Sequence, residues 1–274
     1  MGKISDAFEK REKENILKID NCTREIPIRL EREKPKLDQT RGFRVHDDFS
    51  GELIVASAPD SADAESFRLL RSHLFYGTDG KIPGLIMVTS AFPAEGKTFV
   101  ASNLAASIAI GTDKQVLLVD CDLQKPKIHR LFGLDRSEGV CEYLDRKKSL
   151  QDLTIKTKIP KLSILPAGMV SACPSESISS SGMERFMKKV KEDYQNWAII
   201  VDSAPSHIMA GTRVIGKYVD GILFVVMAEK WPRKEIHKSI ETLGKEKVLG
   251  VVFNGYARAR REYHKYYNKY YSSK

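Results

Sequence analysis

The segment Ala91–Thr98 carries residue types that bind a polyphosphate. Its sequence, AFPAEGKT, ends in Gly-Lys-Thr and follows the apolar run Leu85–Val88. A loop of this kind between a strand and a helix turns successive backbone N–H groups toward phosphates, and the helix N-terminus adds partial positive charge. The pattern predicts that Lys97 reaches the β- and γ-phosphates of a nucleotide and that the Thr98 hydroxyl binds Mg²⁺.

Two further apolar runs end in aspartate. Residues 116–119 lead into Asp120 and Asp122, and residues 198–201 lead into Asp202. Continuous aliphatic runs are typical of strands buried on both faces of a parallel sheet, and such sheets bind ligands at the carboxyl ends of their strands. We therefore expect the three carboxylates to converge on the phosphate loop. The alternative is that each aspartate only caps a turn or a helix after a core strand.

The elements that must position these residues alternate in type along the chain. Aliphatic runs predict strands, and apolar residues three or four apart predict helices. The expected helices begin at Asp60 with Ser61 as a cap, follow the phosphate loop as far as Gly111, and cover 183–194 and 233–243. The expected strands are 85–88, 116–119, 162–165, 198–201, 222–227 and 248–253. This alternation predicts an α/β fold, a P-loop NTPase-type, mostly parallel sheet flanked by helices.

Composition and length divide the chain into three parts. With 274 residues, 42% hydrophobic and 30% charged, it has enough apolar side chains for one full core. Residues 1–59 are expected to be a leader, with a helix at Ser5 to Ile16 and a weakly ordered extended segment, because charged residues dominate there. The ATP-binding domain covers 60–256, and 257–274 form a tail. No apolar run approaches the roughly 20 residues that span a bilayer, and the start lacks a signal-peptide core, so we expect a cytoplasmic protein.

The tail is basic and rich in tyrosine. It holds six Lys or Arg and one Glu, a net charge of +5 (6 − 1) within a chain of net charge +9. Without aliphatic residues it is expected to be flexible. Because the chain also carries a nucleotide site, we interpret the tyrosines as phosphate acceptors rather than as a base-stacking surface for single-stranded nucleic acid. Five of the ten tyrosines lie within nine residues, namely Tyr263, Tyr266, Tyr267, Tyr270 and Tyr271.

These motifs, in this order, resemble those of the bacterial tyrosine autokinases (BY-kinases), in particular the stand-alone cytoplasmic type that works with a membrane-embedded polysaccharide co-polymerase. The phosphate loop resembles the family's Walker A motif. Residues 116–126 resemble its Walker A′ strand with Asp-x-Asp, 199–205 its Walker B motif, and 263–271 its C-terminal tyrosine cluster. The resemblance covers about residues 60–271. Within it, the family's oligomerisation motif is matched by Glu65, Arg68 and Arg71.

The resemblance implies an activity and a set of partners. It implies an ATP-dependent, non-specific protein-tyrosine kinase that autophosphorylates its tyrosine cluster in trans and regulates the synthesis and export of exopolysaccharide or capsular polysaccharide. The implied cofactors are ATP and Mg²⁺. The implied partners are a membrane co-polymerase that activates the kinase, further copies of the chain in a homo-oligomeric ring, and a tyrosine phosphatase, with no nucleic acid. The chain would lie at the inner face of the plasma membrane through its partner.

The resemblance also assigns roles to particular residues. Asp120 is the candidate base for the incoming tyrosine hydroxyl, with Asp122 as the alternative, because both lie at the end of the same strand. Asn254 resembles an adenine-contacting asparagine of related folds, and its other reading is a turn residue. The nucleotide is assigned to Ala94, Glu95, Gly96, Lys97, Thr98, Phe99 and Asn254, the metal to Thr98, Asp122 and Asp202, and the catalytic roles to Lys97, Asp120, Asp122 and Asp202.

The chain departs from the family pattern at several positions. Gln124 and Lys125 stand where two arginines are expected, Ala204 replaces a proline, and the acidic residue expected near Gly211 is missing. A lysine does not reproduce the bidentate grip of arginine on phosphate. Two other functions are compatible with these motifs. One is a partition- or division-site ATPase of the same fold, in which a signature lysine stands where this chain has Phe92. The other is a regulatory scaffold that binds nucleotide without transferring phosphate.

Overall fold

A computed structural model of the chain describes residues 49–76, 83–145, 148–169, 180–207, 210–228 and 230–255. The expected leader helix at residues 5–16 and the tail tyrosines lie outside these ranges. Within them, the α/β architecture predicted from the sequence is confirmed.

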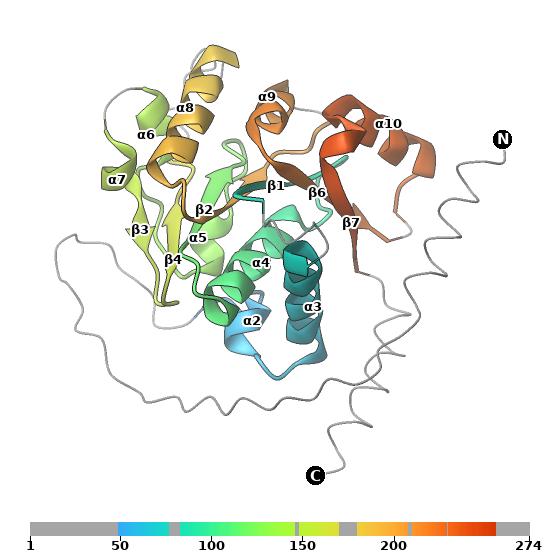
Figure 1. Cartoon of the computed structure of the whole chain (residues 1–274), viewed down its shortest axis with the longest axis horizontal. Coiled ribbons are helices and arrows are strands. Elements are labelled where there is room, and N and C mark those ends of the chain that lie inside the picture. The colour runs from blue at the N-terminus through green and yellow to red at the C-terminus, as the bar shows by residue number, and fades with distance from the viewer. Residues whose placement is uncertain are drawn as a thin grey trace, which may run out of the picture. The chain divides into compact units, whose positions relative to one another are not determined.

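The described chain is built on one seven-stranded sheet in the order β3-β4-β2-β5-β1-β6-β7 (Figure 1). All neighbouring pairs are parallel except β3 and β4, which are antiparallel. The six strands expected from aliphatic runs are confirmed, and the two-residue β3 was not expected. The strands are β1 (Leu85–Ser90), β2 (Val116–Cys121), β3 (Ile155–Lys156), β4 (Leu162–Leu165), β5 (Ala198–Ser203), β6 (Gly221–Met227) and β7 (Val248–Asn254).

Helices cover both faces of the sheet. The longer helices match the regions predicted from apolar periodicity, whereas several one-turn helices and α9 were not expected. On one face lie α2 (Ile54–Ser57), α3 (Ala62–Tyr76), α4 (Lys97–Gly111) and α5 (Ile128–Leu131) (Figure 1). On the other lie α6 (Val140–Leu144), α7 (Leu150–Leu153), α8 (Ser180–Asp193), α9 (Ala210–Tyr218) and α10 (Arg233–Leu243), and a 3₁₀ turn, η2 (Lys245–Lys247), precedes β7.

Each face of the sheet carries its own hydrophobic core. In β1, Leu85 and Met87 belong to the core under α6 to α10, whereas Ile86 and Val88 belong to the core under α2 to α5. This alternation follows from the two-residue period of a strand. Because both faces are covered, every residue of β1, β2 and β5 is buried, which explains why these strands appear in the sequence as continuous aliphatic runs.

The helix expected from Asp60 onward begins as predicted. The backbone N–H of Ala64 donates to the Ser61 hydroxyl at 3.1 Å, so Ser61 caps α3. Residues just before it also join the packed region: Leu53 is fully buried, and the Val55 N–H donates to the Asn103 side chain of α4 at 3.1 Å. The described residues contain no helix that is both long and apolar enough to cross a membrane.

Candidate active site

The phosphate loop joins the end of β1 to the start of α4. Gly96 has φ 89°, and Ala94 has φ 60°, so both lie in the left-handed region. Glycine enters this region without steric cost, and an alanine does so only when its surroundings hold it there. A Cβ on Gly96 would also lie 1.9 Å from the Asn254 side-chain nitrogen. Both the backbone angle and the close neighbour therefore require glycine at position 96.

The backbone of the loop presents free donors. Among the described residues, no backbone N–H of residues 94–99 donates a hydrogen bond, while the Gly96 carbonyl already accepts from Val100 at 2.9 Å. Helix N-termini leave such N–H groups for a cap, water or a ligand, and no side-chain cap is present on α4. The donors, with the N-terminal end of the helix dipole, fit an anionic polyphosphate.

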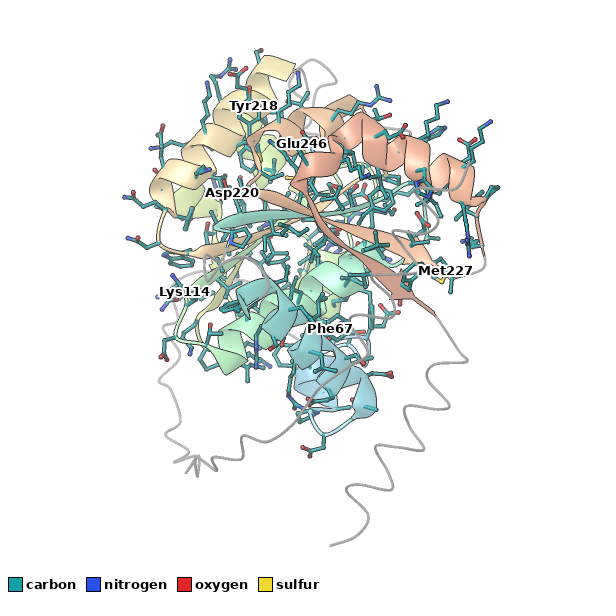
Figure 2. All side chains as sticks on the ribbon, turned by 45° about the vertical axis from the view of Figure 1, so that its right-hand side comes forward. Phe67, Lys114, Tyr218, Asp220, Met227 and Glu246 are labelled. Atoms are coloured by element: carbon teal, nitrogen blue, oxygen red, sulfur yellow. The ribbon has the colours of Figure 1, made fainter. Side chains whose placement is uncertain are left out.

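Glu95 braces the loop from inside the protein. Its side chain is fully buried, and its two carboxyl oxygens accept hydrogen bonds from the Phe92 N–H at 2.8 Å and the Met227 N–H at 3.3 Å. Met227 is the last residue of β6, at the opposite end of that strand from Asp220 (Figure 2). The sequence predicts Glu95 as part of the nucleotide site. In the structure, the Glu95 side chain connects the phosphate loop to the end of β6 through its hydrogen bond with Met227.

Asn254 completes this brace from the end of β7. Its side-chain nitrogen donates to the Glu95 carbonyl at 3.0 Å. The structure therefore places Asn254 in contact with the backbone of the loop at Glu95. Phe99, also predicted at the nucleotide, has its ring against Phe67 of α3, with centroids 5.5 Å apart.

Replacing Glu95 by alanine should loosen the loop. Two partly buried N–H groups would lose their acceptors, and each such loss costs about 1–3 kcal/mol. We expect the midpoint of thermal unfolding to fall by at least about 4 °C, since 1 kcal/mol shifts it by about 2–4 °C in a domain of this size. We also expect nucleotide affinity to fall about 10-fold or more. Circular dichroism melting and titration with a fluorescent nucleotide measure the two effects.

A matched substitution separates the brace from general loss of a carboxylate. Glu241→Ala removes an exposed glutamate from α10 and should leave both quantities unchanged. If Glu95→Ala melts at the same temperature as the parent chain and binds nucleotide equally well, Glu95 does not position the loop.

Asp120 and Asp202 lie side by side at the carboxyl ends of β2 and β5. The two residues are register partners in the parallel pair, and both side chains are buried. Asp120 accepts hydrogen bonds from the N–H groups of Asp122 at 3.2 Å and of Ile128, the first residue of α5, at 3.3 Å. Asp122 in turn accepts from the Lys125 N–H at 3.2 Å. The capping role weighed for these aspartates is thus present for Asp120 and Asp122.

Asp202 differs because no described residue donates a well-formed hydrogen bond to either of its carboxyl oxygens. Burial raises its pKa to about 7, although the nearby Thr98 hydroxyl and the Lys97 ammonium lower the pKa in part. Burial, and then the charge of Asp202, also raise the pKa of Asp120 well above its ordinary value. Strong pKa perturbation of neighbouring carboxyls is typical of functional sites.

The donor set fits a hydrated magnesium ion bound together with phosphates. Within the described ranges, no group of three His, Cys, Asp or Glu side chains forms a ready metal cage. Mg²⁺ does not require one, because it usually keeps several waters and takes one or two carboxylates plus substrate phosphates. The buried, unpaired oxygens of Asp202 beside Thr98 offer such a partial site.

One charged residue near this site was missed by sequence reasoning. The charge of Lys127 lowers the pKa of Asp202, so this exposed lysine lies within electrostatic reach of the carboxyl cluster. Lys127 lies in the same loop after Asp122 as Gln124 and Lys125, the two residues that the family resemblance singles out. This nearness in the sequence could have indicated that Lys127 also lies near the site.

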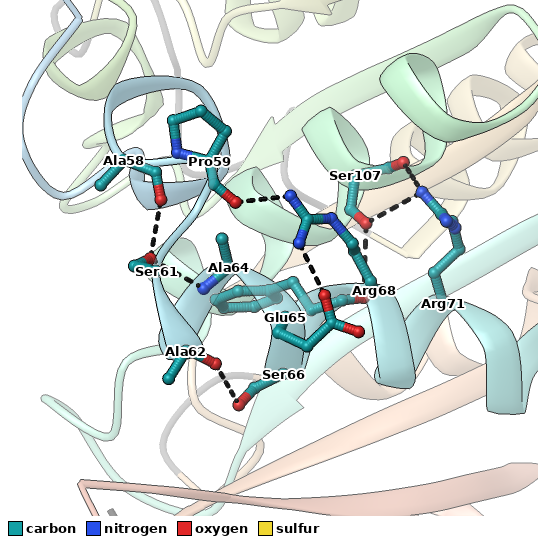
Figure 3. A network of polar contacts seen from close by, with 11 residues as sticks. Ala58, Pro59, Ser61, Ala62, Ala64, Glu65, Ser66, Arg68, Arg71 and Ser107 are labelled. Atoms are coloured by element: carbon teal, nitrogen blue, oxygen red, sulfur yellow. Dashed lines mark hydrogen bonds and ion pairs between the residues drawn. The ribbon is translucent and has the colours of Figure 1, made fainter. Parts of the chain in front are cut away.

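The residues that resemble an oligomerisation motif lie on α3, which packs beside α4 (Figure 3). Arg68 pairs with Glu65 at 2.6 Å and donates to the Pro59 carbonyl at 2.5 Å. Arg71 donates to the Ser107 carbonyl of α4 at 2.6 Å, and a Cβ on Gly111 would overlap its guanidinium group. The side chains of Arg68 and Glu65 are 36% and 29% exposed, which leaves them accessible to another molecule.

Comparisons with known proteins agree with this arrangement. Residues 86–245 match the model of the AAA domain family. The chain is 29% identical over 233 residues to "Tyrosine-protein kinase YwqD" of Bacillus subtilis, covering 84% of this chain and 95% of the relative. It is 31% identical to "Putative tyrosine-protein kinase EpsB" of Ralstonia nicotianae over 74% of this chain, and that match spans only 27% of EpsB.

Solved structures give the same picture. The chimerical protein CapA2B2 superposes with a TM-score of 0.66 at 31% identity, covering 74% of this chain and 89% of that one. The kinase domain of the Escherichia coli tyrosine kinase ETK has a TM-score of 0.66 at 27% identity, with coverage of 74% and 79%. The septum site-determining protein MinD of Pyrococcus horikoshii, complexed with Mg-ADP, shares the fold at a TM-score of 0.52 and 23% identity, covering 64% of this chain and 72% of that one.

Proposed function

The chain belongs to the AAA domain family and, within it, to the bacterial tyrosine kinases, and on this premise we propose that it transfers the terminal phosphate of ATP to tyrosines of its own C-terminal cluster. The observation that carries the proposal is the buried carboxyl of Asp202, which receives no well-formed hydrogen bond from the described residues and lies beside Lys97 and Thr98. A P-loop kinase places a metal-directed carboxylate at this position. The five tyrosines supply the acceptors.

The roles of the residues follow from their environments. Lys97 and the free amides of residues 94–99 hold the phosphates, and Asn254 holds the loop that presents those amides. Thr98 and Asp202, with Asp122 acting through water, are the residues that would hold Mg²⁺. When bound, this ion neutralises charge on the phosphate oxygens.

Asp120 is the proposed base for the tyrosine hydroxyl. Its pKa is raised by burial, so its carboxylate accepts a proton more readily than an ordinary aspartate does. In the transfer step, the tyrosine oxygen forms a bond to the γ-phosphorus, the bond from this phosphorus to the β,γ-bridging oxygen breaks, and ADP leaves. The hydroxyl proton passes to Asp120. Asp122 remains the alternative base, because it lies two residues away at the same strand end.

The proposed setting is polysaccharide export. Relatives of the chain carry kinase names that include CapB and EpsB, and on the family pattern we propose that this kinase regulates exopolysaccharide or capsule synthesis together with a membrane co-polymerase. The proposed location is the cytoplasmic face of the plasma membrane, reached through that partner. A tyrosine phosphatase would reset the tail. We propose residues 60–256 as the kinase domain between leader and tail.

Incubation of the full chain with ATP and Mg²⁺ tests the proposal. We expect intact-mass spectra to gain phosphate increments, and peptide mapping to place them at residues 263–271. Adding cytoplasmic segments of candidate co-polymerases should raise the rate. Nucleotide binding without any phosphotyrosine in either condition would instead support the regulatory scaffold.

One residue of this chain argues against the partition-type ATPase. That class places a lysine where this chain has Phe92, and Phe92 is stacked on Trp231 with ring centroids 4.1 Å apart. The likeness to MinD, at 23% identity, shows the fold alone. ATP hydrolysis stimulated by dimerisation, without tyrosine labelling, would favour this reading.

Substituting Glu65, Arg68 and Arg71 together by alanine should disrupt the proposed ring. In solution, light scattering of the unphosphorylated triple variant should report a monomer where the parent chain reports an assembly. If these residues only make contacts within one chain, worth about 0.2–0.5 kcal/mol for an i,i+3 pair, the mass will stay the same. The matched control removes the Glu184–Lys188 pair of α8, an i,i+4 ion pair of 2.9 Å on the opposite face of the sheet, and should keep the parent's mass.

A further inference from the structure

Three aromatic side chains gather where β5, β1 and β6 end. Phe92 follows β1, His207 follows β5, and Trp231 follows β6. The rings of Phe92 and Trp231 are stacked, with centroids 4.1 Å apart and an interplanar angle of 21°. The ring of His207 lies 5.4 Å from that of Phe92. We call these three residues the aromatic rim. Because the three strands are neighbours in the sheet, the rim lies at the edge where the phosphate loop begins.

Backbone contacts tie the aromatic rim to the phosphate loop. The His207 N–H donates to the Ala91 carbonyl at 3.3 Å, and the Phe92 N–H donates to the buried Glu95 carboxyl at 2.8 Å. Phe92 and Trp231 are only half-buried, and His207 is exposed. The rim is thus fixed relative to the phosphate loop while its rings remain partly open to solvent.

We propose that the aromatic rim binds the phenol ring of the acceptor tyrosine, supplied by the tyrosine-rich tail of a second copy of this chain. The inference rests on the proposed function and deepens it. Phenol is rigid, so when its hydroxyl reaches the terminal phosphate its ring must lie beside the phosphate loop. Aromatic rings pack there in offset or edge-to-face contacts with defined geometry. Serine and threonine have no ring to offer, so the rim selects tyrosine.

Two further observations support this occupant. The indole N–H of Trp231 has no acceptor among the described residues, so a shift of the half-buried ring on binding would let a carbonyl or hydroxyl of the bound segment satisfy it. The tail has a net charge of +5 (6 − 1) and five tyrosines, whereas three aspartates, Asp120, Asp122 and Asp202, lie at the carboxyl ends of β2 and β5. Charge complementarity of this kind favours encounter between the two.

The competing role for Trp231 is purely structural, as a packing residue for the loop between β6 and α10. The two roles differ in what they change. A packing residue affects thermal stability and nucleotide affinity, because the loop also adjoins Met227 and therefore the Glu95 brace. An acceptor subsite changes the Michaelis constant for the acceptor and leaves the reaction of ATP with water unchanged.

The experiment uses full-length chains throughout. The Lys97→Met chain serves as acceptor at varied concentration, and phosphotyrosine formation by the parent, Trp231→Ala and Trp231→Phe enzymes is measured with ATP hydrolysis in the same samples. A stacking contact corresponds to about 2- to 12-fold in binding. We expect Trp231→Ala to raise the acceptor KM about 10-fold, with the KM for ATP and the rate of hydrolysis within 2-fold of the parent. Trp231→Phe should restore most of the acceptor affinity.

A matched control uses the chain's other tryptophan. Trp197 lies before β5, at the opposite end of the strands, where it contacts Tyr194, and Trp197→Ala should leave the acceptor KM unchanged. An unchanged acceptor KM in Trp231→Ala, or a parallel rise in the KM for ATP with a lower melting temperature, overturns the subsite. If the parent enzyme labels no acceptor at any concentration, the proposed function itself fails, and the subsite fails with it. Labelling by the parent enzyme therefore distinguishes a failure of the kinase function from a failure of the acceptor subsite alone.

Discussion

Asp202→Asn is expected to lower tyrosine phosphorylation by ~100-fold or more and at the same time to stabilise the protein in the absence of nucleotide and metal. The loss of activity follows because a positioned charge at the phosphates or metal is typically worth ~100-fold or more in rate. Lys97→Met should show the same loss for the same reason. Labelling reduced only a few-fold in either variant would contradict the proposed site.

The gain in stability follows from the pKa of Asp202. The pKa is about 7 in the folded protein, against 3.8 for an ordinary aspartate, so the folded state binds the proton more tightly than the unfolded state. The stability from this difference is complete below about pH 4 and is lost as the pH rises through 7. At pH 8 the folded protein therefore contains a buried carboxylate that no described residue bonds with good geometry, at a cost of the order of a few kcal/mol.

An asparagine at position 202 avoids that charge, although its own amide lacks partners and offsets part of the gain. We expect a net stabilisation of about 1 kcal/mol at pH 8, which raises the melting temperature by about 2–4 °C. The difference from the parent should shrink at pH 5.5. Melting curves in EDTA at both pH values measure it. Asp113→Asn, which alters an exposed aspartate, is the control and should show no such pH-dependent difference.

Phosphorylation of the tail is expected to dissociate the proposed ring. Each phosphate adds about −1.5 to −2 charges, so five phosphotyrosines would change a tail of net charge +5 (6 − 1) into one of about −2.5 to −5. Above pH 7, where Asp202 is ionised, the carboxylates of the neighbouring site repel that charge once ADP and metal leave. Binding of the tail should therefore weaken as phosphates accumulate, and the contacts between subunits should weaken with it.

Changing all five tail tyrosines to phenylalanine provides the matched variant. It keeps the aromatic rings and removes the acceptor hydroxyls. In ATP and Mg²⁺, light scattering should show that this variant stays assembled while the parent dissociates. If the parent keeps its assembled mass after mass spectrometry confirms several phosphates per chain, phosphorylation is not the switch, even though the kinase assignment would stand.

The sequence by itself determines the order of strands, loop and helices and the positions of the charged residues at strand ends. The aliphatic run before Ala91 predicts β1 because local periodicity and composition dominate the choice of a buried strand. The same reasoning applied to residues 116–119 and 198–201 predicts that Asp120 and Asp202 lie together, since parallel strands end at one edge of the sheet. Their register pairing agrees with that prediction.

Only the tertiary structure decides how these neighbouring groups differ. Asp120 and Asp202 both follow aliphatic strands, yet Asp120 accepts two backbone hydrogen bonds and Asp202 none from the described residues. The contact of Glu95 with Met227 joins residues 132 positions apart, and that of Glu95 with Asn254 joins residues 159 apart. Such contacts, like the stacking of Phe92 on Trp231, arise from the order in which strands from distant segments assemble. Local periodicity carries no information on that order, so these contacts appear only when the sheet has formed.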